Sequence, residues 1–320
     1  MTLFEKTTPT PQSMDHPADY PNGPPFNMDC PDKISFRIST IEGLFNQETT
    51  YNADVINLIT QQPIKQSLCD TPTLDEVKKA MLRMKMVFIM DHASRLVHVV
   101  NLHDGIAEKI LPESQSGFRP NKGTTDMIFS VRQLQEKCME QNKPLYLAII
   151  DLTKAFNTVA RELLWDVLVR SGCPRKFINM IKLMHDQMTT TVLVNDGNST
   201  PFEVKIGVKQ GCLKGPTLFS IFISVVFLIA YPRIPEQLNE IAFRFEGKLF
   251  NLQRLRAKSK ISKSAMVEFQ YADDNAIAAH TEEDLQTILD AFNYAYTQLG
   301  LKINAKKTQV LFQPSPKDTV

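Results

Sequence analysis

The amino-acid sequence predicts an α+β fold, in which a small antiparallel sheet packs on helices. Apolar segments of strand length lie at 144–151 (PLYLAIID) and 269–280 (FQYADDNAIAAH), and both carry aspartates. Amphipathic segments of helix length lie at 124–141, 160–188 and 282–300. The two kinds of segment alternate irregularly, which favours an α+β arrangement over a doubly wound parallel sheet.

The N-terminal third carries few strong patterns. Residues 1–34 are rich in Pro, Thr and Asn and are predicted to be disordered. Residues 35–105 form a weakly patterned linker, within which 72–86 predicts a helix capped by Thr73 with Glu76 three positions on. The segment 87–104 fits a strand or a helix equally well.

The elements after residue 110 are predicted more clearly. A Thr-Thr-Asp cap opens the helix at 124–141, and the strand at 144–151 ends on an aspartate. The remaining elements are two helices within 160–188 separated by Gly172 and Pro174, a hairpin at 190–204 with an Asn-Asp-Gly turn, a buried helix at 218–231, a basic loop at 248–266, the hairpin at 269–280, a helix at 282–300 stopped by Gly300, and a strand at 308–314.

Composition excludes several classes of protein. With 43% hydrophobic and 22% charged residues the chain is globular, and its net charge of +1 means that any nucleic-acid-binding surface is local. Five scattered cysteines without a CxxC pair argue against a disulfide framework or a zinc site and predict a reducing compartment, the cytoplasm or nucleus. The N-terminus has no secretion signal, and the apolar run 218–231 is too short to span a bilayer. We therefore expect an intracellular protein that is neither secreted nor in a membrane.

Three aspartates stand at the ends of the predicted strands. Asp151 follows a buried strand, and Asp273 and Asp274 lie within an otherwise apolar hairpin. Adjacent carboxylates in such surroundings need a positive partner, and carboxylates without nearby His or Cys favour a hard cation such as Mg²⁺ or Mn²⁺. Two simpler alternatives remain: Asp151 caps the next helix, and the Ala-Asp-Asp turn is solvated.

Four motifs resemble those of one polymerase family. DLTKAF (151–156), GVKQGCLKGPTLFSIF (207–222), YADD (271–274) and GLKINAKKTQVL (300–311) occur in the order of motifs A, B, C and D of reverse transcriptases. The segment ILPESQSGFRPNKGTTDMIF (110–129) resembles the region before motif A in non-LTR (LINE-type) retrotransposon reverse transcriptases. The resemblance extends from about residue 106 to 314, so that 106–320 is expected to be a palm domain and 35–105 a degenerate remnant of the fingers.

The resemblance implies a catalytic site and its ligands. It makes Asp151, Asp273 and Asp274 the metal-binding catalytic residues, holding two Mg²⁺ ions, with Mn²⁺ as a possible substitute. The expected substrates are an RNA template, a DNA primer and deoxynucleoside triphosphates; oligomeric state is not predicted. The residues implied in nucleotide or template binding are Phe156, Gln210, Gly211, Lys307 and Arg119.

The individual roles differ in how much the residues themselves support them. The Phe156 ring would exclude a 2′-hydroxyl; without the motif, a core aromatic is the better interpretation. Gly211 would allow close backbone approach and Gln210 a hydrogen bond. Lys307, or its neighbour Lys306, would neutralise or protonate the pyrophosphate; a solvated lysine is an equal alternative. The basic stretch 248–263 either follows a nucleic-acid backbone or is a solvated loop.

Departures from the family pattern leave an alternative function open. Asn157 stands where relatives usually have an aspartate, Lys214 interrupts an apolar part of motif B, and 87–104 resembles no part of the fingers. The sequence ends at Val320 without a recognisable thumb. One expectation is an RNA-directed DNA polymerase that binds metal but turns over poorly; the alternative is a truncated, inactive fragment that only binds RNA or a partner.

Overall fold

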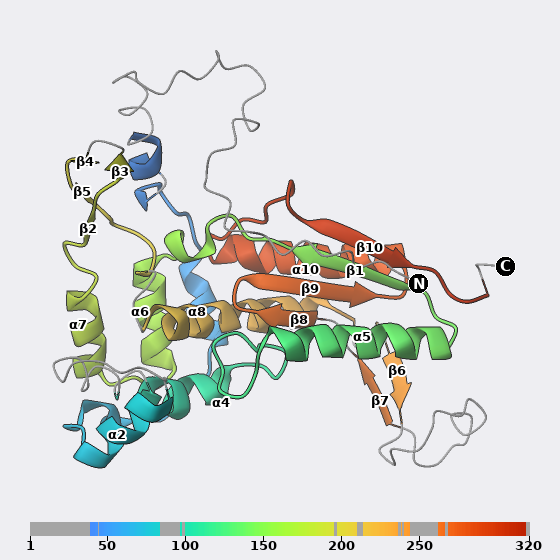
Figure 1. Cartoon of the computed structure of the whole chain (residues 1–320), viewed down its shortest axis with the longest axis horizontal. Helices are drawn as coiled ribbons and strands as arrows, with labels where there is room; N and C mark the ends of the chain where they lie inside the picture. Colours follow the sequence, from blue (N-terminus) through green and yellow to red (C-terminus); the bar gives the residue numbers. More distant parts are fainter. Residues whose placement is uncertain are drawn as a thin grey trace.

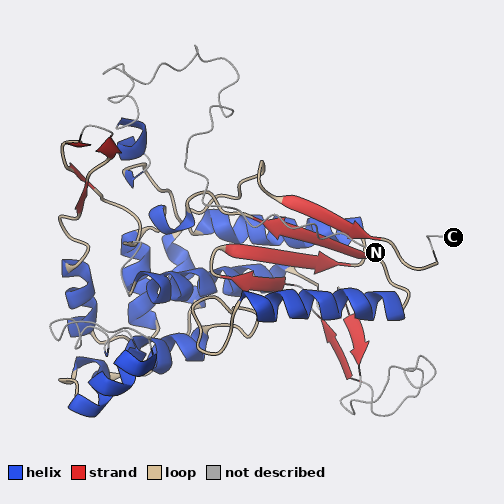
Figure 2. Cartoon of the chain, in the orientation of Figure 1, coloured by secondary structure: helices blue, strands red, loops and turns tan. Residues whose placement is uncertain are grey.

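The computed structural model of the chain describes residues 39–43, 45–83, 97, 100–194, 197–209, 214–235, 238, 240–243, 262–265 and 268–317. The predicted disordered segment 1–34, Gln210, Gly211 and most of 87–104 and 248–263 therefore lie outside the described residues. Within them the α+β prediction is confirmed (Figures 1 and 2). The helices are α2 (Leu74–Arg83), α4 (Glu108–Ile110), α5 (Thr124–Glu140), α6 (Arg161–Arg170), α7 (Arg175–Leu183), α8 (Gly215–Ala230) and α10 (Glu282–Gln298).

Helix ends follow the capping residues in the sequence. At the start of α2 the Thr73 N–H donates to Glu76 Oε2 (2.8 Å) while the Glu76 N–H donates to Thr73 Oγ1 (3.3 Å), which is the expected capping box. At α5 the Asp126 carboxylate accepts from the Gly123 N–H (2.7 Å). After α10, Gly300 takes a φ of +74°, a conformation that glycine adopts without steric cost. These three predicted boundaries are confirmed within a few residues.

The strands form one larger sheet and three two-stranded ones among the described residues. They are β1 (Leu145–Ile150), β2 (Thr189–Thr190), β3 (Leu193–Val194), β4 (Gly197–Asn198), β5 (Phe202–Glu203), β6 (Glu240–Phe243), β7 (Ser262–Ala265), β8 (Glu268–Tyr271), β9 (Asp274–Ala279) and β10 (Gln309–Gln313). The four-stranded sheet is antiparallel with the order β10-β1-β9-β8. The predicted strands at 144–151 and 308–314 and the two predicted hairpins are confirmed.

One predicted loop is wrong in part. The sequence predicts a basic loop over 248–266, whereas 262–265 form β7, which pairs with β6. Ser-Lys-Ser-Ala has no apolar alternation, so the pairing depends on β6, which lies about twenty residues earlier in the chain. A local pattern does not contain such a partner.

Helices pack on both faces of the four-stranded sheet, with α8 and α10 on one side and α5 along the β8 edge on the other (Figure 2). On one face α8 and α10 pack with Ala148, Ile150 and Ile277 in the main hydrophobic core. On the other face α5 contributes Leu134 and Cys138, which pack with Leu147. Ala148 and Ile150 of β1 therefore face one helix layer and Leu147 the other, whereas Ile149 is 46% exposed.

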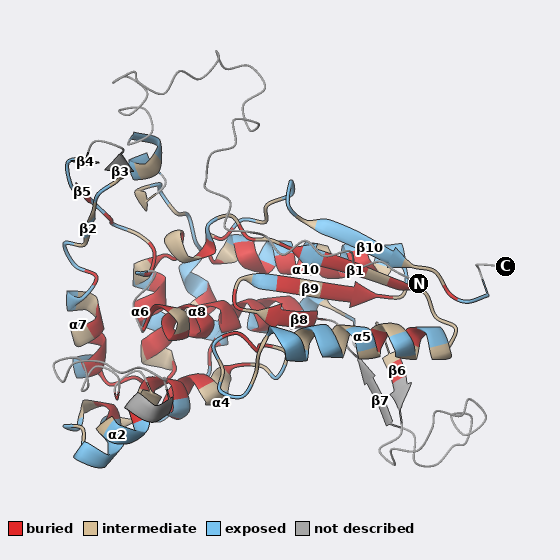
Figure 3. Ribbon diagram, viewed as in Figure 1, coloured by how far each residue is buried: buried red, intermediate tan, exposed pale blue. Residues whose placement is uncertain are grey.

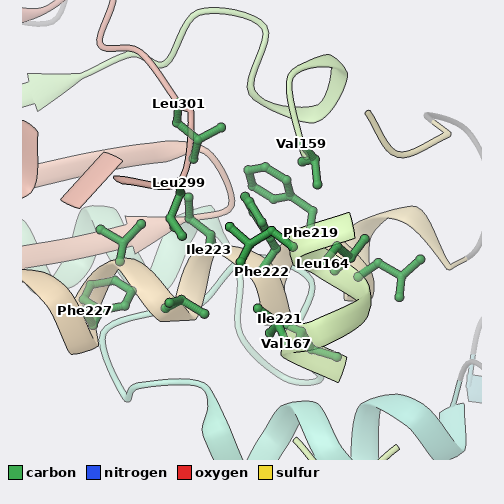
Figure 4. Close-up of a cluster of buried hydrophobic side chains, with 14 of the residues drawn as sticks. Val159, Leu164, Val167, Phe219, Ile221, Phe222, Ile223, Phe227, Leu299 and Leu301 are labelled. Atoms are coloured by element: carbon green, nitrogen blue, oxygen red, sulfur yellow. The ribbon is translucent and has the colours of Figure 1, made fainter. Parts of the chain in front are cut away.

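Helix α8 is the centre of the main core. Phe219, Phe222 and Phe227 of α8 are at most 3% exposed and pack near α6 and the segment after α10 (Figure 4). Each such burial contributes about 1.5–3 kcal/mol to folding. By length and composition Gly215–Arg233 could cross a membrane, but 78% of its apolar window is buried inside the protein. This burial confirms the predicted core helix.

Candidate active site at the end of the four-stranded sheet

The strand register brings the three aspartates to one end of the sheet (Figure 1). Ile150 pairs with Asn275, so Asp151, the next residue, lies opposite Asp274 at the end of the ladder. Tyr271 pairs with Asp274 across the β8-β9 hairpin, which leaves Ala272 and Asp273 as its two-residue turn. Two segments more than 120 positions apart in the chain thus bring their aspartates to the same end of the sheet.

The electrostatics of the three groups agrees with this arrangement. Burial raises the pKa of Asp273, and the negative charge of Asp151 raises it further. The pKa of Asp274 is raised by burial and then by the charges of Asp273 and Asp151. Like charges influence one another in this way only at short range, so a cation bound among these carboxylates would be stabilised.

The donor set fits a hard divalent cation in its chemistry. Carboxylate oxygens are the ligands that Mg²⁺ and Mn²⁺ prefer, and Asp151, Asp273 and Asp274 offer six of them. Among the described residues, however, no three His, Cys, Asp or Glu side chains already converge to hold a metal ion. A bound cation would have to draw these carboxylates together. The predicted convergence of the Asp151 and Asp273 carboxylates to within about 6 Å, where charges perturb each other strongly, stays a prediction.

The motif D segment is anchored to the aspartate of motif A. The Asn304 N–H donates to the Asp151 carbonyl (2.8 Å), and the Thr153 N–H donates to the Lys302 carbonyl (2.8 Å). The Asn304 carbonyl in turn accepts from the Lys307 N–H (3.1 Å), so Lys307 lies in a turn attached directly to the end of β1. Lys306 and Lys307 are both exposed, as a role toward a charged substrate requires.

Phe156 lies in an aromatic cluster beside the aspartates. Its ring stacks on Phe219 of α8, with centroids 4.1 Å apart and planes at 19°. The exposed ring of Phe118 meets it edge-on at 6.3 Å and lies 6.5 Å from the ring of Tyr271. Phe156 is thus half-buried, with the core ring of Phe219 stacked on it and the exposed ring of Phe118 at its edge. The cluster joins motif A, motif B, motif C and the segment before motif A.

Gln210 and Gly211 lie outside the described residues, but the chain on both sides of them is placed. The Gly207 N–H donates to the Val159 carbonyl and the Val208 N–H to the Phe156 carbonyl, both at 2.9 Å. A Cβ at Gly207 would lie 2.7 Å from the Asn157 carbonyl oxygen, so this approach to motif A requires glycine. These contacts attach the start of the motif B segment directly to motif A.

Lys214 and Asn157, the two residues that depart from the family pattern, both make packing contacts within the protein. Lys214 is 5% exposed, and its Nζ lies 3.5 Å from Met184 Sδ and 5.9 Å from the centre of the Phe177 ring. Its charge lies over an aromatic face rather than in solvent. Asn157 packs its backbone against Gly207.

Arg119 is engaged inside the protein. Its Nε and Nη2 donate to the two carboxylate oxygens of Glu108 (3.1 and 2.7 Å), and its Nη1 donates to the carbonyls of Pro112 and Gln115 (both 3.0 Å). With a side chain only 9% exposed, it holds the loop from α4 to α5 together. A contact of Arg119 with phosphate or template stays a prediction.

Phe118 was not singled out from the sequence. It has a φ of +61°, which is unusual for a bulky side chain and is typical of functional or strained positions. The only sequence clue is its place in SGFRP, where the neighbouring arginine draws attention first.

Comparison with known proteins identifies the family. The family model described as reverse transcriptase (RNA-dependent DNA polymerase) matches residues 77–318. The chain is 28% identical over 200 residues to a Pol polyprotein of the type-1 retrotransposable element R2 of Bradysia coprophila, covering 62% of this chain and 20% of that protein. It is 24% identical over 205 residues to the RNA-directed DNA polymerase of the mobile element jockey of Drosophila melanogaster, covering 62% and 19%.

A solved structure supports the fold. A telomerase from Candida tropicalis, solved with a fragment of telomeric RNA, aligns with a TM-score of 0.51 at 11% identity, over 89% of this chain and 45% of that chain. This likeness concerns the fold alone. The chain spans about a fifth of the length of the curated relatives that it matches. With the four motifs in order and the aspartates of motifs A and C at one end of the sheet, the chain belongs to the reverse transcriptase family, as a domain of the non-LTR retrotransposon type.

Proposed function

We propose that this domain adds deoxynucleotides to the 3′-hydroxyl of a DNA primer, copying an RNA template with the help of divalent cations. The observation that carries the proposal is the register of β1 and β9, which places Asp151 opposite Asp274 with Asp273 in the adjoining turn. The names of the relatives, RNA-directed DNA polymerase among them, support the choice of reaction.

Each group at the end of the sheet has a role in this reaction. Asp151, Asp273 and Asp274 would hold Mg²⁺, which stabilises negative charge on the attacking and leaving oxygens in phosphoryl transfer. Burial first, and then repulsion between the carboxylates, raises the pKa values of Asp273 and Asp274, and a bound cation would relieve both effects. Lys307 or Lys306, on the turn bonded to Asp151, would face the pyrophosphate.

The aromatic cluster would determine the choice of sugar. Phe156 is held from behind by Phe219, so its ring cannot retreat far from a nucleotide bound beside Asp151. A 2′-hydroxyl would meet this ring, whereas a deoxyribose would not. Deoxynucleotides are therefore the proposed substrates.

A primer-extension assay with an RNA template and Mg²⁺ or Mn²⁺ tests the proposal. We expect metal-dependent extension, slow but measurable, that Asp273→Asn lowers by at least about 10²-fold, since it removes charge stabilisation in the transition state. In the same assay Phe156→Ala should raise the ratio of ribonucleotide to deoxynucleotide incorporation. Glu162→Gln, on the first turn of α6, is a charge-matched control that should extend normally.

The outcomes separate the two functions considered. Extension that survives Asp273→Asn would contradict the proposed site. Binding of RNA without extension under either metal would instead favour a domain that only binds nucleic acid.

A further inference from the structure

The segment 114–117 lies along β8 like an additional strand. The Ser116 N–H donates to the Gln270 carbonyl (2.8 Å), and the Gln270 N–H donates to the Ser114 carbonyl (3.0 Å). Gln115 and Gln270 form a parallel bridge. A segment about 150 residues away in the sequence thus occupies the outer side of the hairpin that carries Asp273 and Asp274.

The side chain of Gln115 reaches the turn of that hairpin. Its Oε1 accepts from the Ala272 N–H (3.0 Å) and from the Gly117 N–H (2.7 Å), and its Nε2 lies 3.5 Å from the Ala272 carbonyl oxygen. The same carbonyl accepts from Gln270 Nε2 (2.9 Å). Gln115 and Gln270 are both 0% exposed, so water does not compete for these bonds.

The turn needs such support because its backbone is unusual. Ala272 has a φ of +59°, a region that residues other than glycine, asparagine and aspartate seldom adopt. Backbone of this kind persists where the surroundings over-determine it. Gly117 also packs directly on the turn, since a Cβ there would lie 2.2 Å from the Ala272 nitrogen.

We infer that Gln115 is a positioning residue, which holds the Ala272–Asp273 turn in the shape that presents Asp273 and Asp274 to a divalent cation. The inference rests on the proposed function, since it concerns the same cation site. The hydrogen bonds of the Gln115 side chain within the described part of the chain go to Ala272 and Gly117 and not to the carboxylates. It acts through the backbone of Ala272, the residue directly before them.

Binding of Mn²⁺ to the metal-free chain, followed by electron paramagnetic resonance, tests the inference without depending on polymerase activity. Gln115→Met keeps the length of the side chain but removes both amide functions. We expect it to weaken Mn²⁺ binding by about 10–100-fold, as is typical when a group that orients metal ligands is lost. Asp273→Asn should abolish the same binding and so mark the site.

A stability control distinguishes positioning from a merely structural role. Ile178→Val removes one methyl from a residue 3% exposed in α7, away from the four-stranded sheet (Figure 1). It should lower the melting temperature and leave Mn²⁺ affinity unchanged. If Gln115→Met does not fold, Gln115→Asn, which keeps the amide but is one methylene shorter, should show the same loss in weaker form.

The Mn²⁺-binding experiment separates a failure of the inference from a failure of the proposed function. A wild-type chain that binds no Mn²⁺ would overturn both. A wild type that binds Mn²⁺, with Gln115→Met binding equally well or with Ile178→Val losing affinity in parallel, would overturn the role of Gln115 alone.

Discussion

The two edges of the four-stranded sheet are built in opposite ways. At one edge, residues 268–270 of β8 are at most 8% exposed and are covered by the segment 114–117. At the other edge, Val310, Leu311 and Phe312 of β10 are between 44% and 59% exposed (Figure 3). Both are edge strands of the same sheet, yet among the described residues a further segment pairs along only one of them.

The closed edge, which residues 114–117 cover, is the one that leads into the candidate metal ligands. The hairpin with Asp273 and Asp274 begins on β8, and its turn contains a strained residue that neighbouring backbone must hold. Strand β10 carries no candidate ligand, and its backbone pairs with β1. Support from outside the sheet is thus concentrated where the geometry of a side chain matters.

The largest loss of stability is expected at Gly117, where the segment 114–117 packs most closely on the β8-β9 hairpin. Gly117→Ala would force a Cβ to 2.2 Å from the Ala272 nitrogen, which is backbone and cannot move aside alone. We expect a loss of about 3 kcal/mol or more in the free energy of unfolding, measured by denaturant titration.

Gly123→Ala is the matched control for this change. A Cβ at Gly123 would lie 3.8 Å from Asp126 Oδ2, and the expected cost is less than about 1 kcal/mol. Equal costs at the two glycines would contradict the close packing of residues 114–117 on the hairpin.

The next largest effect concerns the loop that leads to the closed edge. Arg119→Ala breaks a bidentate pair with Glu108 and two bonds to backbone carbonyls, and should cost about 2–3 kcal/mol. Lys122→Ala, which breaks an exposed pair with Glu113, should cost less than about 1 kcal/mol. Thermal unfolding of both variants measures the contrast, and a cost for Lys122→Ala as large as that for Arg119→Ala would refute it.

A smaller effect is expected from the pH dependence of stability. Because the folded state raises the pKa of Asp273 above its ordinary 3.8, it binds that proton more tightly than the unfolded state. Stability should therefore fall as pH rises from about 3.8 through the raised pKa. Asp273→Asn removes this loss, so without metal it should be more stable than wild type near neutral pH, by less than about 1 kcal/mol for a partly solvated group.

Denaturant titrations from pH 4 to 7 in a chelator check this expectation. The advantage of Asp273→Asn should shrink toward pH 4, and Mn²⁺ should stabilise only the wild type. An advantage that does not change with pH would argue against a raised pKa of Asp273, and so against its burial beside Asp151.

The smallest effect is expected at the open edge. Val310→Lys changes a side chain that is 59% exposed and should alter the free energy of unfolding by less than about 0.5 kcal/mol. A charge on an exposed edge strand also discourages pairing between copies, so any self-association measured by sedimentation should decrease. A large loss of stability would mean that this edge is covered in solution.

Much of the fold could be predicted because its elements carry their own local patterns. Strand β1, the β8-β9 hairpin, α5 and α10 have apolar periodicity, turn residues and caps within a dozen residues of each other. Strand β7 was predicted as loop, because its polar residues form a strand only by pairing with β6. The predicted roles of Gln210 and Gly211 lie outside the described residues.

For the candidate site, the sequence by itself determined which groups are candidate metal ligands: Asp151, Asp273 and Asp274 stand out as charges in apolar strands. Only the tertiary structure decided what holds them in place. The amide of Gln115, the close approach of Gly117 and the ring of Phe118 act across more than 35 positions of sequence. A periodic pattern reports burial of a residue along its own element, whereas a hydrogen bond between distant segments depends on how the elements pack, which no local pattern contains.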